Sequence, residues 1–164
     1  MITLNNENST CLCGSGLSYA DCCQPFHDGR QIPKTAAALM RSRFTAYAGQ
    51  NAAYLLDTWA IETRPPDIDF SKESANWQSL TIVDTKKGGE LDAKGIVEFK
   101  AFYRQDDNDH FMHEISRFVK TGGRWYYLDG KIKAAGRVGI TTDTGRNAPC
   151  ACGSGKKFKR CCGR

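Results

Sequence analysis

The chain lacks any hydrophobic run long enough to cross a bilayer, which excludes a membrane-spanning helix. Its first residues carry neither the basic cluster nor the apolar stretch of a secretion signal, so we expect a cytoplasmic protein with no membrane insertion. The sequence also lacks a Ser-His-Asp set, a phosphate-binding loop and paired carboxylates at a recognisable spacing. We therefore assign no catalytic residue from the sequence.

No cysteine lies outside two short segments, one near each end of the chain. Each segment has the pattern C-x-C-G-S-G, five further residues and C-C. The first set is Cys11, Cys13, Cys22 and Cys23, and the second set is Cys150, Cys152, Cys161 and Cys162. Four thiols at matched offsets suit a tetrahedral metal ion at about 2.3 Å from each sulfur. The Gly-Ser-Gly step supplies residues that accept a positive φ in a tight turn.

A disulfide framework is the alternative interpretation, because small proteins with an even number of cysteines often have one. Adjacent cysteines such as Cys161 and Cys162 would form a strained disulfide, and no secretion signal is present. We therefore predict two metal sites, one ion in each, with zinc as the metal and iron as its competitor. Four sulfurs close the coordination shell, which favours a structural role over catalysis. His27 could replace one thiolate, although a nearby loop histidine is the simpler interpretation.

The positive charge of the chain is concentrated at its C-terminal end. Residues 146–164 contain six Lys and Arg residues and no acid, so this tail carries +6 and, with a total of +5, the remainder carries −1. A four-thiolate zinc site contributes about −2, which leaves the tail at about +4. The candidate partner-binding residues are Lys156, Lys157, Lys159 and Arg160. They suit an acidic protein or a ribonucleoprotein; direct nucleic-acid binding is the weaker option, and a solubilising charge run is the alternative.

Between the two cysteine segments, the hydrophobic pattern changes from a helical period to a period of two. Thr35 is the expected N-cap of a helix that ends at Gly49, and Asn51 is the expected cap of a second helix. Strands are expected at Gln78–Lys86, Gly95–Tyr103, Phe111–Lys120 and Arg124–Asp129. This order predicts an α+β fold with helices on one face of a curved antiparallel sheet. We expect a metal-binding segment at 1–30, a central domain at 31–140 and a second metal-binding segment at 141–164.

The third expected strand places charged side chains on both of its faces. His113 and Arg117 share one face, and Glu114 lies on the other. If either face lines a cavity, Glu114 or the His113/Arg117 pair forms its polar floor. The alternatives are a solvated face, or a buried salt bridge of Glu114 with Arg41 or Arg43.

The last cysteine segment, with its Gly-Lys-Lys-Phe-Lys-Arg insert, resembles the SEC-C motif over residues 147–162. This motif is the zinc-binding tail of the translocation ATPase SecA, where it engages the chaperone SecB and the ribosome. The resemblance implies that the four C-terminal cysteines are metal ligands and that the tail binds a partner. In the first segment, the basic positions are occupied by Leu17, Ser18, Ala20 and Asp21. We therefore expect the first segment to be a structural clasp.

The chain as a whole is similar to the YchJ family of bacterial proteins, on the evidence of residues 39–47, 54–59, 113–118 and 124–130. The resemblance implies a nuclear-transport-factor-2-like cone and brings no established reaction. We expect a cytosolic zinc-binding adaptor whose C-terminal SEC-C motif docks on a protein or ribonucleoprotein partner. The alternative is an enzyme or small-molecule binder that uses a pocket in the central domain, with purely structural zinc sites.

Overall fold

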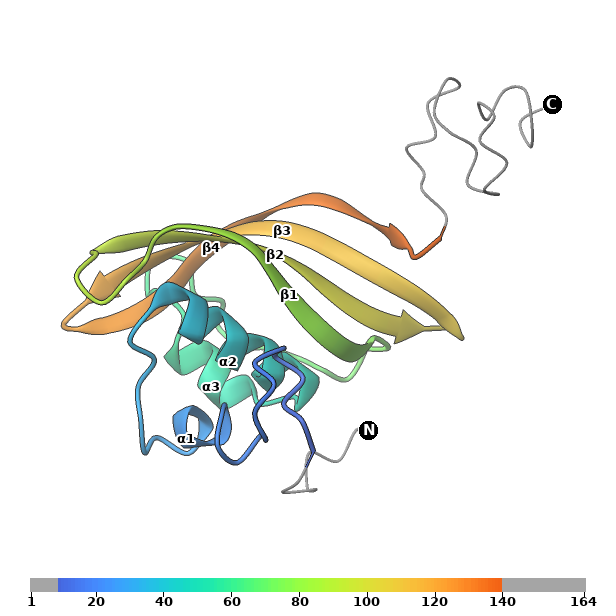
Figure 1. Cartoon of the computed structure of the whole chain (residues 1–164), viewed down its shortest axis with the longest axis horizontal. Coiled ribbons are helices and arrows are strands. Elements are labelled where there is room, and N and C mark those ends of the chain that lie inside the picture. Colours follow the sequence, from blue (N-terminus) through green and yellow to red (C-terminus); the bar gives the residue numbers. More distant parts are fainter. Residues whose placement is uncertain (1–8, 140–164) are drawn as a thin grey trace.

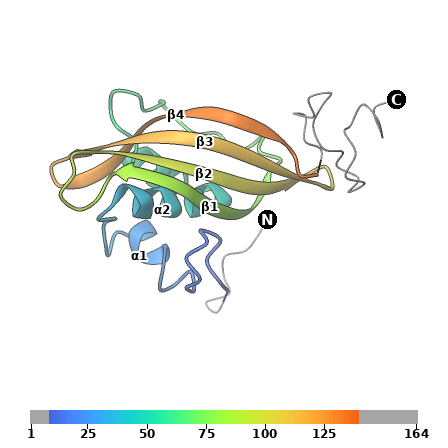
Figure 2. The same ribbon diagram turned by 45° about the horizontal axis from the view of Figure 1, so that its top comes forward.

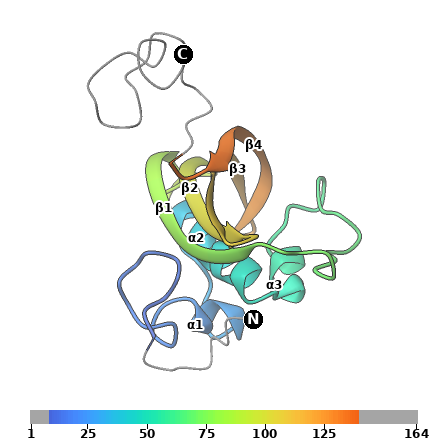
Figure 3. The same ribbon diagram turned by 90° about the vertical axis from the view of Figure 1, so that its right-hand side faces the viewer.

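The computed structural model describes residues 9–139, in which helices precede a four-stranded sheet (Figure 1). The elements are α1 (Gln24–His27), α2 (Ala36–Ala48), α3 (Ala52–Asp57), β1 (Asn76–Lys87), β2 (Lys94–Gln105), β3 (Asn108–Thr121) and β4 (Arg124–Arg137). Each strand pairs antiparallel with the next, in the order β1-β2-β3-β4. The sheet curves around α2 (Figure 3), so the predicted arrangement of helices on one face of a curved sheet is confirmed.

Two predicted capping residues fix the starts of the main helices. The side chain of Thr35 accepts a hydrogen bond from the backbone N–H of Ala38 at 3.1 Å, and α2 begins at Ala36, directly after Thr35. The side chain of Asn51 accepts one from Tyr54 at 3.0 Å and caps α3. Each bond satisfies a backbone donor that has no partner within the helix.

The hydrophobic core lies between α2 and the concave face of the sheet. Alternate residues of β2 are buried there, namely Val97, Phe99 and Ala101, because successive side chains of a strand point to opposite faces. The core consists of these three residues and Ala36, Leu39, Met40, Phe44, Leu80, Phe118 and Trp125. The concave face is therefore the apolar face of the sheet, and polar side chains on it need a specific explanation.

Strand β4 extends eight residues beyond its predicted end at Asp129, to Arg137. The sequence after Gly130 has few apolar residues, so its pattern did not indicate a strand. The extension continues the pairing with β3, in which Glu114 is opposite Ile132 and Met112 is opposite Ala135. Backbone pairing, and not burial, therefore extends this strand.

The segment from residue 9 to residue 30 packs beside α2 and below the sheet (Figure 2). Leu12 packs against the main core, and Arg41 of α2 donates a hydrogen bond from Nη1 to the carbonyl oxygen of Cys13. None of the helices in residues 9–139 has the length and apolar character needed to span a membrane. The expected C-terminal segment at 141–164 lies outside the described residues.

Candidate metal centre

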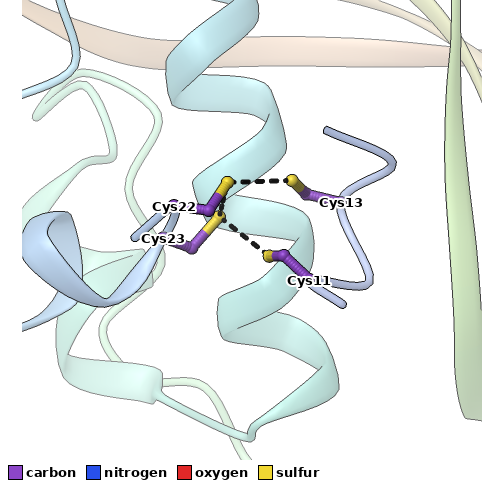
Figure 4. A group of neighbouring side chains, drawn as sticks. All are labelled: Cys11, Cys13, Cys22 and Cys23. Carbon is purple, nitrogen blue, oxygen red and sulfur yellow. Dashed lines mark hydrogen bonds between the residues drawn. The ribbon is translucent and has the colours of Figure 1, made fainter. Parts of the chain in front are cut away.

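The four N-terminal cysteines form one cluster, in which all four sulfur atoms lie within 4.8 Å of one another (Figure 4). Cys11, Cys13 and Cys23 are buried, and Cys22 is half-buried. The Sγ atoms are 3.5 Å apart for Cys11 and Cys23 and 3.4 Å apart for Cys13 and Cys22. All four are free thiols, so this set forms no disulfide.

The geometry of the cluster matches what a tetrahedral thiolate site requires. Four sulfurs about 2.3 Å from a central ion lie about 3.8 Å from one another. The closest contacts in the cluster run from 3.4 Å to 3.8 Å, the latter between the adjacent residues Cys22 and Cys23. A donor set made only of sulfur favours a thiophilic ion. The structure thus brings the four residues together in an arrangement compatible with metal binding.

The tight turn between the two cysteine pairs depends on glycine. Gly14 and Gly16 have φ values of +78° and +82°, which other residues adopt only with strain. The loop is closed by a hydrogen bond from the backbone N–H of Cys11 to the carbonyl oxygen of Leu17 at 2.7 Å. This turn brings Cys11 and Cys13 opposite the second pair, which directly precedes α1, with Cys23 at the N-cap position of the helix.

Two hydroxyl groups lie within hydrogen-bond distance of the sulfurs. Ser15 Oγ is 3.0 Å from Cys22 Sγ. Thr45 Oγ1, on the buried face of α2, is 3.4 Å from Cys23 Sγ and 3.6 Å from Cys11 Sγ. A hydroxyl that donates to a thiolate stabilises its charge and orients it toward the ion. Sequence reasoning did not identify Thr45, because only the tertiary packing places it beside the cysteines.

His27 is engaged by the protein through both of its ring nitrogens. Nε2 donates to the carbonyl oxygen of Ser42 at 2.8 Å, so Nδ1 accepts from the hydroxyl of Tyr19 at 2.9 Å. Burial lowers the pKa of His27, which favours this neutral form. The histidine therefore links the N-terminal segment to α2 and does not replace a thiolate.

The close packing of four thiols makes their protonation states interdependent. Hydrogen bonding from Cys11 holds the pKa of Cys13 well below its ordinary value. Burial raises the pKa of Cys22 to about 11, and hydrogen bonding with Cys11 raises the pKa of Cys23. All four sulfurs become thiolates at neutral pH only when a cation balances their charge. Metal binding therefore releases protons and weakens as the pH falls.

The three candidate pocket residues lie on opposite faces of the sheet, as their alternation along the strand predicted. His113 and Arg117 are on the convex face of the sheet, where His113 Nε2 is 2.7 Å from Glu98 Oε1 and Arg117 pairs with Asp129. Glu114 is on the concave face, where Ser116 Oγ donates to it at 2.7 Å. Within residues 9–139, neither Arg41 nor Arg43 forms a salt bridge with Glu114, the arrangement considered as one alternative to a pocket.

The other predicted site residues lie outside the described part of the chain. These are the C-terminal cysteines Cys150, Cys152, Cys161 and Cys162, and the basic residues Lys156, Lys157, Lys159 and Arg160. The prediction that these four cysteines form a second metal site thus rests on the sequence pattern alone.

Comparison with known families identifies both parts of the chain. Residues 35–130 match the nuclear-transport-factor-2-like middle domain of YchJ, and residues 8–25 and 146–164 each match the SEC-C motif. Fold and site together define a nuclear-transport-factor-2-like protein with a SEC-C motif near each end. The chain belongs to the YchJ family, whose members carry the name UPF0225 protein.

Relatives resemble the chain over three quarters of its length or more. The UPF0225 protein of Serratia proteamaculans is 45% identical, and the match covers 94% of this chain and 97% of that protein. The UPF0225 protein of Geobacter sulfurreducens is 42% identical, and the match covers 93% of this chain and 97% of that protein. A crystal structure of a SEC-C motif containing protein from Psychrobacter arcticus has a TM-score of 0.64 at 32% identity, covering 96% of this chain and 97% of that one. A solution structure of a second SEC-C motif containing protein, from Rhodopseudomonas palustris, has a TM-score of 0.67 at 33% identity, and the match covers 75% of this chain and 98% of that one.

Replacing Thr45 by valine should weaken metal binding at the N-terminal site about tenfold, because it removes a hydroxyl beside two sulfurs without changing side-chain size. The affinity is measured by competition with a chelator. The four C-terminal cysteines are first changed to serine in the full chain, so that only the N-terminal site titrates. Thr81→Val, at an exposed position of β1, is the control and should change nothing. Identical competition curves for both variants would contradict the role assigned to Thr45.

Proposed function

We propose that the protein is a cytosolic zinc-binding adaptor. Each cysteine set holds one zinc ion, the central domain serves as the scaffold, and the basic C-terminal SEC-C motif docks on an acidic protein or ribonucleoprotein. The observation that carries the proposal is the convergence of four buried or half-buried sulfurs from a sequence pattern that occurs twice in the chain. Because four thiolates complete a tetrahedral shell, the metal has a structural role.

The choice of zinc rests on the donor set. Thiolates bind both zinc and iron, but closed four-sulfur shells that stabilise a small fold are characteristic of zinc. The number of ions follows from the sequence, since the second set repeats the offsets of the first. Two ions per chain are therefore expected.

The contacts of the N-terminal segment support a clasp rather than a docking element. Ser18 Oγ donates to Asp21 Oδ2 at 2.8 Å, so the loop positions that are basic in the C-terminal motif bond here to each other. The cluster is also held against α2 through Thr45 and Arg41. Its sulfurs thus stabilise the fold, and the excess of basic over acidic residues lies in the C-terminal segment of the sequence.

Changing Lys156, Lys157, Lys159 and Arg160 to glutamate should reduce partner recovery at least about tenfold in affinity capture from cells, because the recognition is electrostatic. Recovery by the unchanged protein should also fall as salt is added. The matched control changes four exposed lysines of the central domain to glutamate, namely Lys72, Lys86, Lys94 and Lys131.

The control variant carries the same change in net charge, so it should retain the partner. If both variants lose the partner equally, the net charge of the protein, and not the C-terminal motif, determines recovery. If the tail variant recovers the partner undiminished and independently of salt, the docking proposal is wrong. Nuclease treatment of the captured material separates a ribonucleoprotein from a protein partner.

A further inference from the structure

A cavity of about 240 Å³ lies between α2 and the concave face of the sheet. Its wall is predominantly apolar, with aromatic rings from Phe44, Phe99 and Tyr127 and thioethers from Met40 and Met112. Two ionisable side chains, Arg43 of α2 and Glu114 of β3, line the same space. An apolar cavity with a few convergent polar groups is the usual form of a small-molecule site.

Arg43 is a buried cation of α2. Its side chain is 2% exposed, and Nη1 donates to two neutral oxygens, Leu55 O and Thr58 Oγ1, each at 2.7 Å. The guanidinium also lies over the rings of Trp59 and Tyr127, at 5.0 Å and 4.6 Å from their centres. No ion pair within residues 9–139 includes it. Burial lowers its pKa to about 10, so the group remains charged at neutral pH.

The carboxyl group of Glu114 lies beside Gly130, which has no side chain. A Cβ atom on Gly130 would lie 1.9 Å from Glu114 Oε1, so any other residue at this position would displace the carboxyl group. Ser116 donates a hydrogen bond to the same oxygen at 2.7 Å. Burial raises the pKa of Glu114, which favours its neutral form beside the cavity. The cavity is therefore lined by a buried guanidinium and by a carboxyl group whose pKa lies above its ordinary value.

We propose that this cavity binds a small monocarboxylate of single-ring size. The ligand carboxylate pairs with Arg43, and its apolar body lies against the aromatic and methionine side chains. A buried charge is costly without a charged partner, and an anion in the cavity supplies the partner that the described residues do not. The site is independent of the metal centre.

The volume limits the size of the ligand. An apolar cavity of roughly 150 Å³ is enough for benzene, so about 240 Å³ accommodates one ring with a carboxylate substituent. A nucleotide or a peptide does not fit. The indole N–H of Trp77, another residue of the wall, is buried and has no hydrogen-bond partner among the described residues.

The test is a titration of the full, metal-loaded chain with benzoate and with benzamide, its neutral analogue of similar shape, followed by amide NMR signals. Benzoate should bind saturably with a dissociation constant of about 1 mM, shifting the signals of residues around the cavity. Benzamide should bind at least about tenfold more weakly, since it lacks the charge that pairs with Arg43. No saturable shift with benzoate, or equal affinity for both probes, would overturn the proposal.

Three variants locate the site. Arg43→Met should weaken benzoate binding at least about tenfold. Glu114→Gln should tighten it about threefold, because the amide cannot ionise and repel the anion. Ala101→Leu should abolish binding of both probes by filling the cavity. Glu114→Gln and Ala101→Leu test the site even if Arg43→Met does not fold. If neither of these two variants alters benzoate binding, the assignment to this cavity is wrong.

Discussion

We expect the Cys13→Ala variant to lose the N-terminal metal ion and about 4 kcal/mol or more of unfolding free energy, because loss of a structural metal is among the few single-residue changes with effects of this size. The Cys13 side chain is 0% exposed, and its sulfur lies 3.4 Å from that of Cys22. Without it, only three of the four thiolates remain to hold the ion. Urea unfolding and metal analysis of the purified full chain measure the two effects.

Leu17→Ala is the matched control for the Cys13 variant. Leu17 lies in the same loop, contributes no sulfur and is 54% exposed, so its change should alter stability by less than about 0.5 kcal/mol and leave the metal content as it is. If Cys13→Ala retains the full metal content and unfolds at the same urea concentration as the control, Cys13 is not a ligand.

The Gly14→Ala variant should lose about 3 kcal/mol of unfolding free energy, whereas Gly16→Ala should lose only about 1 kcal/mol. Both glycines have a positive φ, so each change costs the strain of a left-handed alanine. They differ in their surroundings: a Cβ on Gly14 would lie 2.5 Å from the carbonyl oxygen of Leu80, and a Cβ on Gly16 would meet no atom within 4 Å. The difference of about 2 kcal/mol isolates the contact between the metal loop and β1.

Urea unfolding of both variants with metal bound measures the difference. A further readout is the affinity for the metal, which should fall more for Gly14→Ala because the carbonyl of the adjacent Cys13 is also held by Arg41. Equal losses for the two variants would mean that the loop is not seated against the strand as described.

The fold could be predicted where local chemistry determines it. Thr35 and Asn51 mark helix starts because a cap needs one particular side chain at one position. The end of β4 could not be predicted, since residues 130–137 are held by pairing with β3 and carry no hydrophobic alternation. Which face of the sheet is concave also depends on how it packs against α2, and so the strand pattern left open whether Glu114 or His113 faces the interior.

The candidate metal centre was visible in the sequence because its four sulfurs come from a stretch of thirteen residues, 11–23. A tetrahedral site built from so short a segment imposes a fixed spacing, and the spacing can be recognised without a structure. The residues that support it come from α2 and lie outside that spacing. Thr45 approaches the sulfurs and Ser42 binds His27 through its carbonyl oxygen. Between them in the sequence, Arg43 lines the cavity, so one helix supports both sites.

The most direct test of the account is the metal content of the full chain after the four C-terminal cysteines have been changed to serine. Only Cys11, Cys13, Cys22 and Cys23 then remain, and protein purified without added metal should contain one equivalent of zinc per chain. The unchanged protein should contain two. A serine variant that holds no transition metal, although its four thiols react quantitatively as free cysteines, would contradict the claim that the N-terminal cluster is a metal centre.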